Sequence, residues 1–159
     1  MGTKTDSRVI IDAPLDFVWD STNDVADWPE LFTEYAMAEV LHAEGNLIRF
    51  RLTMHPDPQG NAWSWVSERE LDPANRKVVA RRIELGWFEY MDIVWTYRQT
   101  PSGVEMRWQQ SFAMRDDAPL DDAAMGERIT TNSAIQMRHI KEKVEQRHRA
   151  LLSVSGGQR

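Results

Sequence analysis

The sequence predicts a single α+β domain in which a curved antiparallel sheet wraps round a long C-terminal helix. Three observations lead to this fold class. Five or six segments in the middle of the chain alternate between apolar and polar residues, with short turn signals between them. Segments joined so tightly can only be antiparallel neighbours. The end of the chain instead repeats apolar residues at helical spacing, and its 159 residues, 42% of them hydrophobic, suit one core rather than two.

The first elements are a short strand and two short helices. The strand is expected over residues 8–11, after which Asp12 can cap a helix that has Pro14 in its first turn. Phe17, Val18 and Trp19 supply the apolar face of this helix. A second short helix is expected over residues 27–32.

The sheet and the closing helix follow. Turn-forming sequences such as Glu44-Gly45-Asn46 separate the alternating segments. These strands are predicted over residues 35–43, 47–55, 62–71, 77–85, 88–99 and 104–114. The last helix is predicted over residues 122–152, with Leu151 continuing its apolar face. Residues 1–152 are therefore expected to form the domain, and residues 153–159 a flexible tail.

Composition excludes several classes of protein. The chain has no apolar run long enough for a membrane span and no signal-peptide pattern, so a cytoplasmic protein without membrane contact is expected. The absence of cysteine agrees with a reducing compartment. A net charge of −6 argues against nucleic-acid binding, which needs a basic surface. No metal, nucleotide or acyl-serine motif is present, so neither a metal nor a cofactor is expected.

The apolar face of the predicted sheet carries a few polar residues. Large apolar residues alternate on this face. The sets are Ile48, Phe50, Leu52 and Met54; Trp63, Trp65, Ser67 and Arg69; Met91, Ile93 and Trp95; and Met106, Trp108, Gln110 and Phe112. Aromatic residues at this spacing are usually core. Ser67, Arg69 and Gln110 favour an interior cavity instead, because inward polar groups need partners.

Arg69 allows two interpretations, since a buried guanidinium needs a partner. It can belong to a structural ion pair, with Glu34, Glu84 or Glu89 as the candidate carboxylates. Alternatively, it can face a ligand oxygen in a wet cavity. Arg69 shares its strand face with Ser67 and the tryptophans, and this favours the second interpretation.

Four stretches of this sequence resemble one known family. They are APLDFVWDSTNDVADWPELF, WSWVSERELDP, RRIELGWFEYMDIVWTY and MRWQQSF. They look like the single-domain aromatase/cyclases of bacterial type II aromatic polyketide pathways, particularly the spore-pigment and tetracenomycin kinds. The resemblance spans residues 8–144. The opening pattern, from Ala13 to Pro29, is shared with the wider START-like superfamily and implies its helix-grip fold with an interior cavity.

The resemblance also implies a reaction and a set of site residues. The substrate would be a linear poly-β-ketone carried by an acyl carrier protein, and the enzyme would act together with other polyketide synthase components. The first ring would close by aldol condensation between the ninth and fourteenth carbons and then lose water. Arg69 and Tyr35 would be catalytic. The substrate-binding residues would be Trp28, Phe32, Met54, Trp63, Trp65, Ser67, Met91, Trp95, Trp108, Gln110 and Asn132.

The residues themselves suit this chemistry. A fixed guanidinium at Arg69 can stabilise charge that develops on enolate and carbonyl oxygens. Because arginine is a poor proton donor, protons would pass through Tyr35, Ser67 or water. A histidine and aspartate pair is not expected, since Gln109, Gln110 and Asn132 occupy the corresponding places.

Two further hypotheses concern partners and alternatives. Basic clusters at Arg81-Arg82 and over residues 138–149 are candidates for the surface that meets the acidic carrier protein. The rival function is a non-catalytic protein that binds or transfers hydrophobic ligands, because many helix-grip domains do only that. A stress or chaperone-like module is a third possibility, and it would expose its apolar surface.

Overall fold

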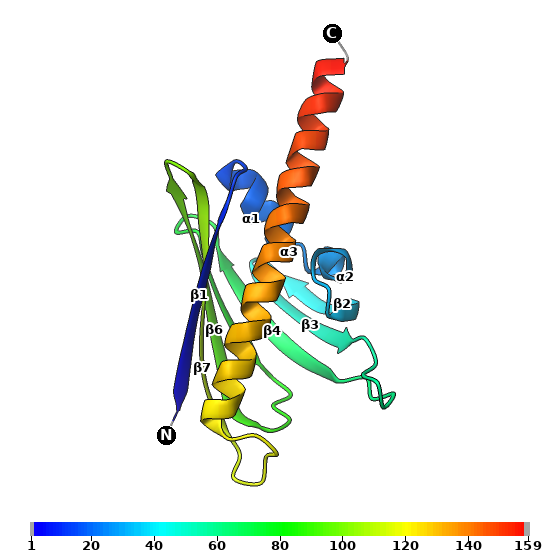
Figure 1. Cartoon of the computed structure of the whole chain (residues 1–159), viewed down its shortest axis with the longest axis vertical. Coiled ribbons are helices and arrows are strands. Elements are labelled where there is room, and N and C mark those ends of the chain that lie inside the picture. Colours follow the sequence, from blue (N-terminus) through cyan, green and yellow to red (C-terminus); the bar gives the residue numbers. More distant parts are fainter. Residues whose placement is uncertain (1, 158–159) are drawn as a thin grey trace.

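The computed structural model describes residues 2–157 as one antiparallel sheet with helices on its concave side (Figure 1). The elements are β1 (Thr3–Ile11), α1 (Leu15–Asn23), η1 (Val25–Asp27), α2 (Trp28–Leu31), β2 (Tyr35–Glu44), β3 (Leu47–Met54), β4 (Ser64–Asp72), β5 (Lys77–Arg82), β6 (Phe88–Thr100), β7 (Gly103–Met114) and α3 (Asp122–Gly157). The sheet order is β1-β7-β6-β5-β4-β3-β2, so every neighbour in sequence from β2 onward is also a neighbour in space. The predicted α+β helix-grip fold is confirmed.

β1 is longer than the sequence predicts. It begins at Thr3 rather than Arg8, and it pairs with β7 from Thr3 opposite Phe112 to Ile11 opposite Val104. The segment TKTDS shows no apolar alternation, so its strand character comes from pairing with the long neighbouring strand rather than from its own pattern.

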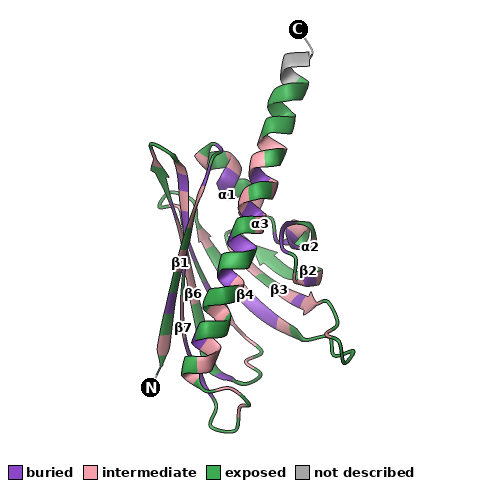
Figure 2. Ribbon diagram, in the orientation of Figure 1, coloured by how far each residue is buried: buried purple, intermediate pink, exposed green. Residues whose placement is uncertain are grey.

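α3 also extends beyond its predicted end, since it continues as helix to Gly157. At 1.5 Å per residue its 36 residues span about 54 Å. Buried residues recur along its middle, whereas residues 149–154 lie past the sheet and are exposed (Figure 2). Leu151 is 55% exposed, because no element remains for the helix to pack against. Residues 153–157 are thus helical, and residues 158–159 lie outside the described part.

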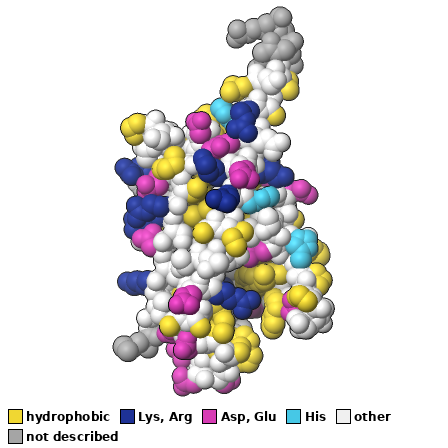
Figure 3. All heavy atoms as spheres, in the orientation of Figure 1, with side chains coloured by type: hydrophobic (Ala, Val, Ile, Leu, Met, Phe, Trp, Pro, Cys, Tyr) yellow, Lys and Arg dark blue, Asp and Glu magenta, His cyan; other side chains and the backbone are white. Residues whose placement is uncertain are grey.

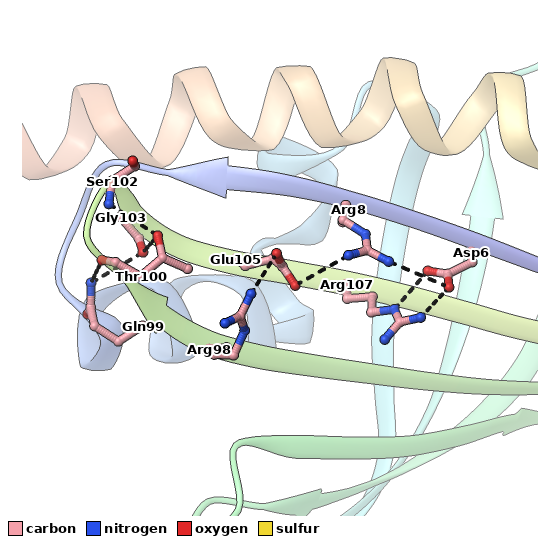
Figure 4. A network of polar contacts seen from close by, with 9 residues as sticks. All are labelled: Asp6, Arg8, Arg98, Gln99, Thr100, Ser102, Gly103, Glu105 and Arg107. Atoms are coloured by element: carbon pink, nitrogen blue, oxygen red, sulfur yellow. Dashed lines mark hydrogen bonds and ion pairs between the residues drawn. The ribbon is translucent and has the colours of Figure 1, made fainter.

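The outer face of the sheet is polar, which fixes the direction of the inner face. Arg107 pairs with Asp6 across β7 and β1, and Glu105 accepts a hydrogen bond from Arg98 at 3.2 Å (Figure 4). Arg8 lies 4.0 Å from the same Glu105 carboxylate. These side chains alternate with buried residues on β7, so the apolar residues predicted on the inner face of this strand do point inward.

Two apolar clusters fill the inner side. The larger lies between the sheet, α1, α2 and α3, and a smaller one gathers Phe88, Met91, Phe112 and Met114 near the start of α3. Among residues 2–157, no helix has the length and apolar character that a membrane crossing requires.

Candidate functional site

β4 directs a charged residue into the interior. Along this strand Ser67 and Arg69 are buried and Trp65 is half-buried, while Glu70 is exposed. The alternation follows from the pleat, which sends successive side chains to opposite faces. The inward position predicted for Trp65, Ser67 and Arg69 is therefore confirmed.

Trp63 lies at the surface rather than among the buried rings, and its place in the pocket stays a prediction. Its side chain is 55% exposed, and β4 begins only at Ser64. The backbone before Ser64 belongs to the connection from β3, where the Trp63 carbonyl accepts a hydrogen bond from the Met54 amide at 2.8 Å. This hydrogen bond continues the β3–β4 pairing one position beyond Thr53 opposite Ser64, although the Trp63 side chain stays exposed.

Arg69 is held by an amide and two aromatic rings. Its side chain is 2% exposed, and its Nη2 donates a hydrogen bond of 2.7 Å to Oδ1 of Asn23. The guanidinium carbon lies 4.9 Å from the ring centroid of Trp28 and 4.4 Å from that of Trp95. Such cation–π contacts stabilise a desolvated cation.

Among the described residues, no carboxylate forms an ion pair with Arg69. Of the three candidates named above, Glu84 pairs with Arg51 at 3.0 Å, Glu34 accepts a hydrogen bond from Asn132 at 2.9 Å, and Glu89 is exposed. Burial lowers the pKa of Arg69 to about 10, so the group stays charged at neutral pH. The interpretation as a structural ion pair therefore loses its support.

Two buried donors in this region have no hydrogen-bond partner among residues 2–157. They are Nε of Arg69 and Nε1 of Trp108. An unpaired buried N–H costs free energy, so such groups call for an explanation. Both can donate to an oxygen of a bound molecule.

Asn23 belongs to a network that the sequence analysis missed. Its Nδ2 donates to the carbonyl of Trp19 at 2.9 Å and to the Tyr97 hydroxyl at 3.4 Å. The Tyr97 hydroxyl also lies 2.7 Å from Oγ1 of Thr22, and burial raises its pKa to about 12. A signal was present, because Asn23 follows Trp19 by four residues and therefore lies on the buried face of α1.

Stacked aromatic rings surround the guanidinium. Trp95 stacks on Trp108 with centroids 4.6 Å apart and on Trp28 at 5.8 Å. Phe32 stacks on Trp108 at 6.0 Å, and Tyr35 stacks on Trp28 at 6.1 Å. All five are buried. The interior cavity predicted from the sequence is thus closed at this level, because apolar walls gain contact energy by packing together.

Tyr35 adjoins a second polar group that the sequence analysis named only as a structural partner. Burial, followed by the neighbouring Glu34 charge, raises the pKa of Tyr35 well above its ordinary value. Burial also raises the pKa of Glu34, although its hydrogen bond from Asn132 acts in the opposite direction. Glu34 thus links Asn132 of α3 to Tyr35 at the start of β2.

The other predicted residues take three different places. Met54 and Trp65 are half-buried, and Figure 3 shows hydrophobic side chains in a hollow beside α3, over β3 and β4. Gln110 is tied to β1 by a hydrogen bond of 2.6 Å from Thr5. Met91 belongs to the smaller apolar cluster, away from the rings around Arg69.

The predicted basic cluster at Arg81 and Arg82 is not one surface. Arg81 is exposed and lies 3.6 Å from Glu68, whereas Arg82 is half-buried and follows it on the opposite face of β5. On α3, Lys141 pairs with Glu145, and Arg147 pairs with Asp27 at 2.6 Å. Part of the second predicted cluster is thus neutralised.

Comparison with known proteins places this fold and site in a family. The family described as Polyketide cyclase / dehydrase and lipid transport matches residues 11–133. A proposed polyketide cyclase of Streptomyces cyaneus is 55% identical over 146 residues, which cover 92% of this chain and 96% of that protein. Another, from Streptomyces halstedii, is 59% identical over 108 residues, covering 68% of this chain and 99% of that protein.

A solved structure supports the same conclusion for the fold. The Zhui aromatase/cyclase from Streptomyces sp. R1128 superimposes with a TM-score of 0.80 at 22% identity, covering 92% of this chain and 96% of that one. The chain therefore belongs to the polyketide cyclase / dehydrase and lipid transport family, as a polyketide cyclase with the helix-grip fold.

Proposed function

We propose that this protein is an aromatase/cyclase that closes the first ring of a carrier-bound linear poly-β-ketone and dehydrates it to an aromatic ring. The observation that carries the proposal is the Arg69 guanidinium, which is buried, charged, stacked against two indole rings and free of any carboxylate partner among the described residues. A structural role would call for a neutralising carboxylate. A catalytic role calls for a fixed cation whose field stays available to a ligand oxygen.

The aromatic rings would orient the substrate. An aldol step requires an enolate carbon and a ketone carbon of one flexible chain to meet, and holding them in reach removes much of the entropic barrier. Flat walls such as Trp95 and Trp108 favour the planar, enolised form of a β-diketone by stacking. Because the rings are closed in this structure, they would also exclude water from the reacting atoms.

Arg69 would act on the developing charge. As the new carbon–carbon bond forms, the electrons of the attacked carbonyl move onto its oxygen, and Nε of Arg69 can donate to that alkoxide. Trp108 Nε1 offers a second donor nearby on the neighbouring ring. The alkoxide then takes a proton, and the resulting hydroxyl leaves as water when the adjacent carbon loses a proton.

Tyr35 and Glu34 would move these protons. The methylene between two ketones is already acidic, so a weak base is sufficient. Glu34 has a raised pKa through burial, which improves it as a proton acceptor. Tyr35 is buried between Glu34 and the rings, and its hydroxyl can relay the proton.

The regiochemistry and the partner rest on the resemblance noted in the sequence. We place ring closure between the ninth and fourteenth carbons, and we expect an acyl carrier protein to deliver the chain. No cofactor takes part in this chemistry, because both steps are proton transfers and carbon–carbon or carbon–oxygen bond changes.

Reconstitution with a minimal polyketide synthase tests the proposal. Addition of the protein should replace the shunt products of spontaneous cyclisation by one product with a ring closed at the stated carbons, identified by mass spectrometry and NMR. A ligand carrier without catalysis would leave the set of products unchanged, because it has no reason to stabilise an oxyanion. That outcome would contradict the proposal and favour the transfer function.

A further inference from the structure

Arg82 is a second cation on the inner face of the sheet. It lies at the end of β5, where the register places it opposite Ser67 of β4. Residues paired in an antiparallel sheet share a face, so Arg82 points to the same side as Ser67 and Arg69. Its neighbour Arg81 points to the outer face and is exposed.

The surroundings of Arg82 resemble those of Arg69. Its guanidinium carbon lies 4.7 Å from the ring centroid of Trp65 and 5.1 Å from that of Phe88. Its Nε donates to the backbone carbonyl of Glu84 at 3.1 Å, and no described carboxylate lies within ion-pair distance. Burial lowers its pKa to about 10. The side chain is thus fixed by rings and backbone, and its charge is not neutralised by a pair.

The two arginines are separated by a short, defined step. The residue opposite Arg69 is Ala80, and Arg82 lies two residues further along β5, which is about 7 Å at the usual rise of a strand. Both arginines act on Tyr35: the charges of Arg69 and Arg82 each lower the pKa of Tyr35, whereas burial has a larger effect and raises it. Arg82 is the less buried of the two, beside the half-buried Trp65.

We propose that Arg82 forms a second oxygen-binding subsite, which takes an enolate or phenolate oxygen of the same ligand whose reacting carbonyl meets Arg69. This inference rests on the proposed function. A poly-β-ketone carries an oxygen on every second carbon, so a single anchor leaves its register free to slip by one repeat. Two cations a fixed distance apart select one register, and Arg82 thereby contributes to the choice of the carbons that meet.

A phosphate of the carrier's pantetheine arm is the less suitable occupant. The whole arm and the first part of the chain lie between that phosphate and the ring-forming carbons, whereas Arg82 is about 7 Å from Arg69 along the strand direction. The aromatic rings on either side of Arg82 also fit a flat conjugated ligand better than a hydrated phosphate.

Ligand binding provides the first test, with Arg81→Gln as the matched control on the other face of the same strand. The probes are emodin, which carries free phenol groups, and its fully O-methylated ether. Tryptophan fluorescence should show that Arg82→Gln weakens emodin binding about tenfold and changes the affinity for the ether much less. Arg81→Gln should alter neither. Equal losses for both probes would overturn the subsite, because they would indicate lost stacking alone.

Product analysis in the reconstituted system provides the second test. Arg82→Gln should shift the ratio between products that differ in the position of the first ring, and Arg82→Lys should restore part of it. A wild-type ratio in Arg82→Gln would overturn the inference, and failure of both variants to fold would assign Arg82 to structure. Arg69→Ala separates the two claims: if it changes the products while Arg82→Gln does not, only the subsite fails, and if it changes nothing, the proposed function fails.

Discussion

Arg69 is a permanently charged side chain whose closest polar partner is a neutral amide. Most buried charges are paired, because desolvation of an isolated ion is costly. Here the Asn23 oxygen and the faces of Trp28 and Trp95 offset part of that cost without cancelling the charge. The arrangement keeps a positive field directed at whatever enters the ring cluster.

Asn23→Asp tests the value of this neutral partner. A carboxylate at Oδ1 would pair with the Arg69 guanidinium at hydrogen-bond distance and neutralise its field. The cyclisation rate should fall at least tenfold at neutral pH, while the thermal midpoint changes by no more than a few degrees. Asp24→Asn, at the exposed next residue, is the control and should leave both quantities unaltered. Full activity in Asn23→Asp would contradict a role for the free charge.

Glu34 predicts a pH dependence of stability. Its pKa in the folded state is raised above 4.5 by burial, so ionisation of this group opposes folding. Its favourable contribution is present below pH 4.5 and is lost as the pH rises through the raised pKa. Glu34→Gln cannot ionise, so its free energy of unfolding should increase relative to the wild type over this rise.

Urea denaturation at several pH values measures that difference. Glu30→Gln, at an exposed position, controls for the loss of one negative charge. A constant difference between Glu34→Gln and the wild type from acid to neutral pH would show that Glu34 does not titrate as burial requires.

At the residue scale the sequence could predict which side chains point inward, but not all of their partners. The alternation of residues along β4 is sufficient to predict that Ser67 and Arg69 point inward, because this prediction depends only on the period of a strand. The partner Asn23 lies 46 positions away on another element, and only the folded topology brings the two together. Alternation also does not predict the 55% exposure of Trp63, which lies just before the first residue of β4.

The β6–β7 hairpin depends on one glycine. Gly103 has φ of +139°, and a Cβ there would lie 2.5 Å from the carbonyl oxygen of Ile11. The Thr100 hydroxyl donates to the Gly103 carbonyl at 2.7 Å, which closes the turn (Figure 4). This turn sets the register of β7, and β7 in turn pairs with β1.

Gly103→Ala should therefore destabilise the fold by more than about 1 kcal/mol, since it adds backbone strain and a clash with main chain. Gly45→Ala is the matched control, because Gly45 also has positive φ, +58°, but a Cβ there meets nothing within 4 Å. Thermal denaturation of both variants should show the larger loss for Gly103→Ala. Equal losses would mean that the close approach to Ile11 has no energetic effect.

At the element scale, order and type were predictable because the turn signals and the two periodicities agree. The residues at which strands and helices begin and end were less predictable. β1 and α3 both run beyond the apolar pattern, β1 because it pairs with β7 and α3 because its last turns continue as helix without packing on the sheet. Patterns of burial cannot locate the end of a helix that is exposed on all sides.

The whole molecule has the helix-grip fold, and aromatic side chains pack together between its sheet and its helices. The sequence predicts an interior cavity, because inward polar groups need partners. The structure supplies several of those partners from the protein itself, Asn23 for Arg69 and Thr5 for Gln110, and lets the rings pack together. Sequence patterns identify the residues that point into such a site, but they do not show whether the aromatic rings there contact one another or leave space between them.

Closure has a consequence for ligand entry. The Arg69 guanidinium is buried against Trp28 and Trp95, so binding of a substrate to it should change tryptophan emission strongly. The hollow beside α3, over β3 and β4, is the approach that we expect a substrate to take (Figure 3). Catalysis and exclusion of water would then depend on the same side chains.

The most direct test of the account is Arg69→Ala, measured both for its thermal midpoint and for the ratio of correctly cyclised product to shunt products. The account predicts a midpoint within a few degrees of the wild type and a ratio close to that of the reaction without this protein. Tyr35→Phe should give a smaller loss of the same ratio, because it removes only the proton relay. A member of a buried ion pair would instead destabilise the fold by about 3 to 5 kcal/mol when removed. A folded Arg69→Ala protein with a wild-type product ratio would contradict the central claim.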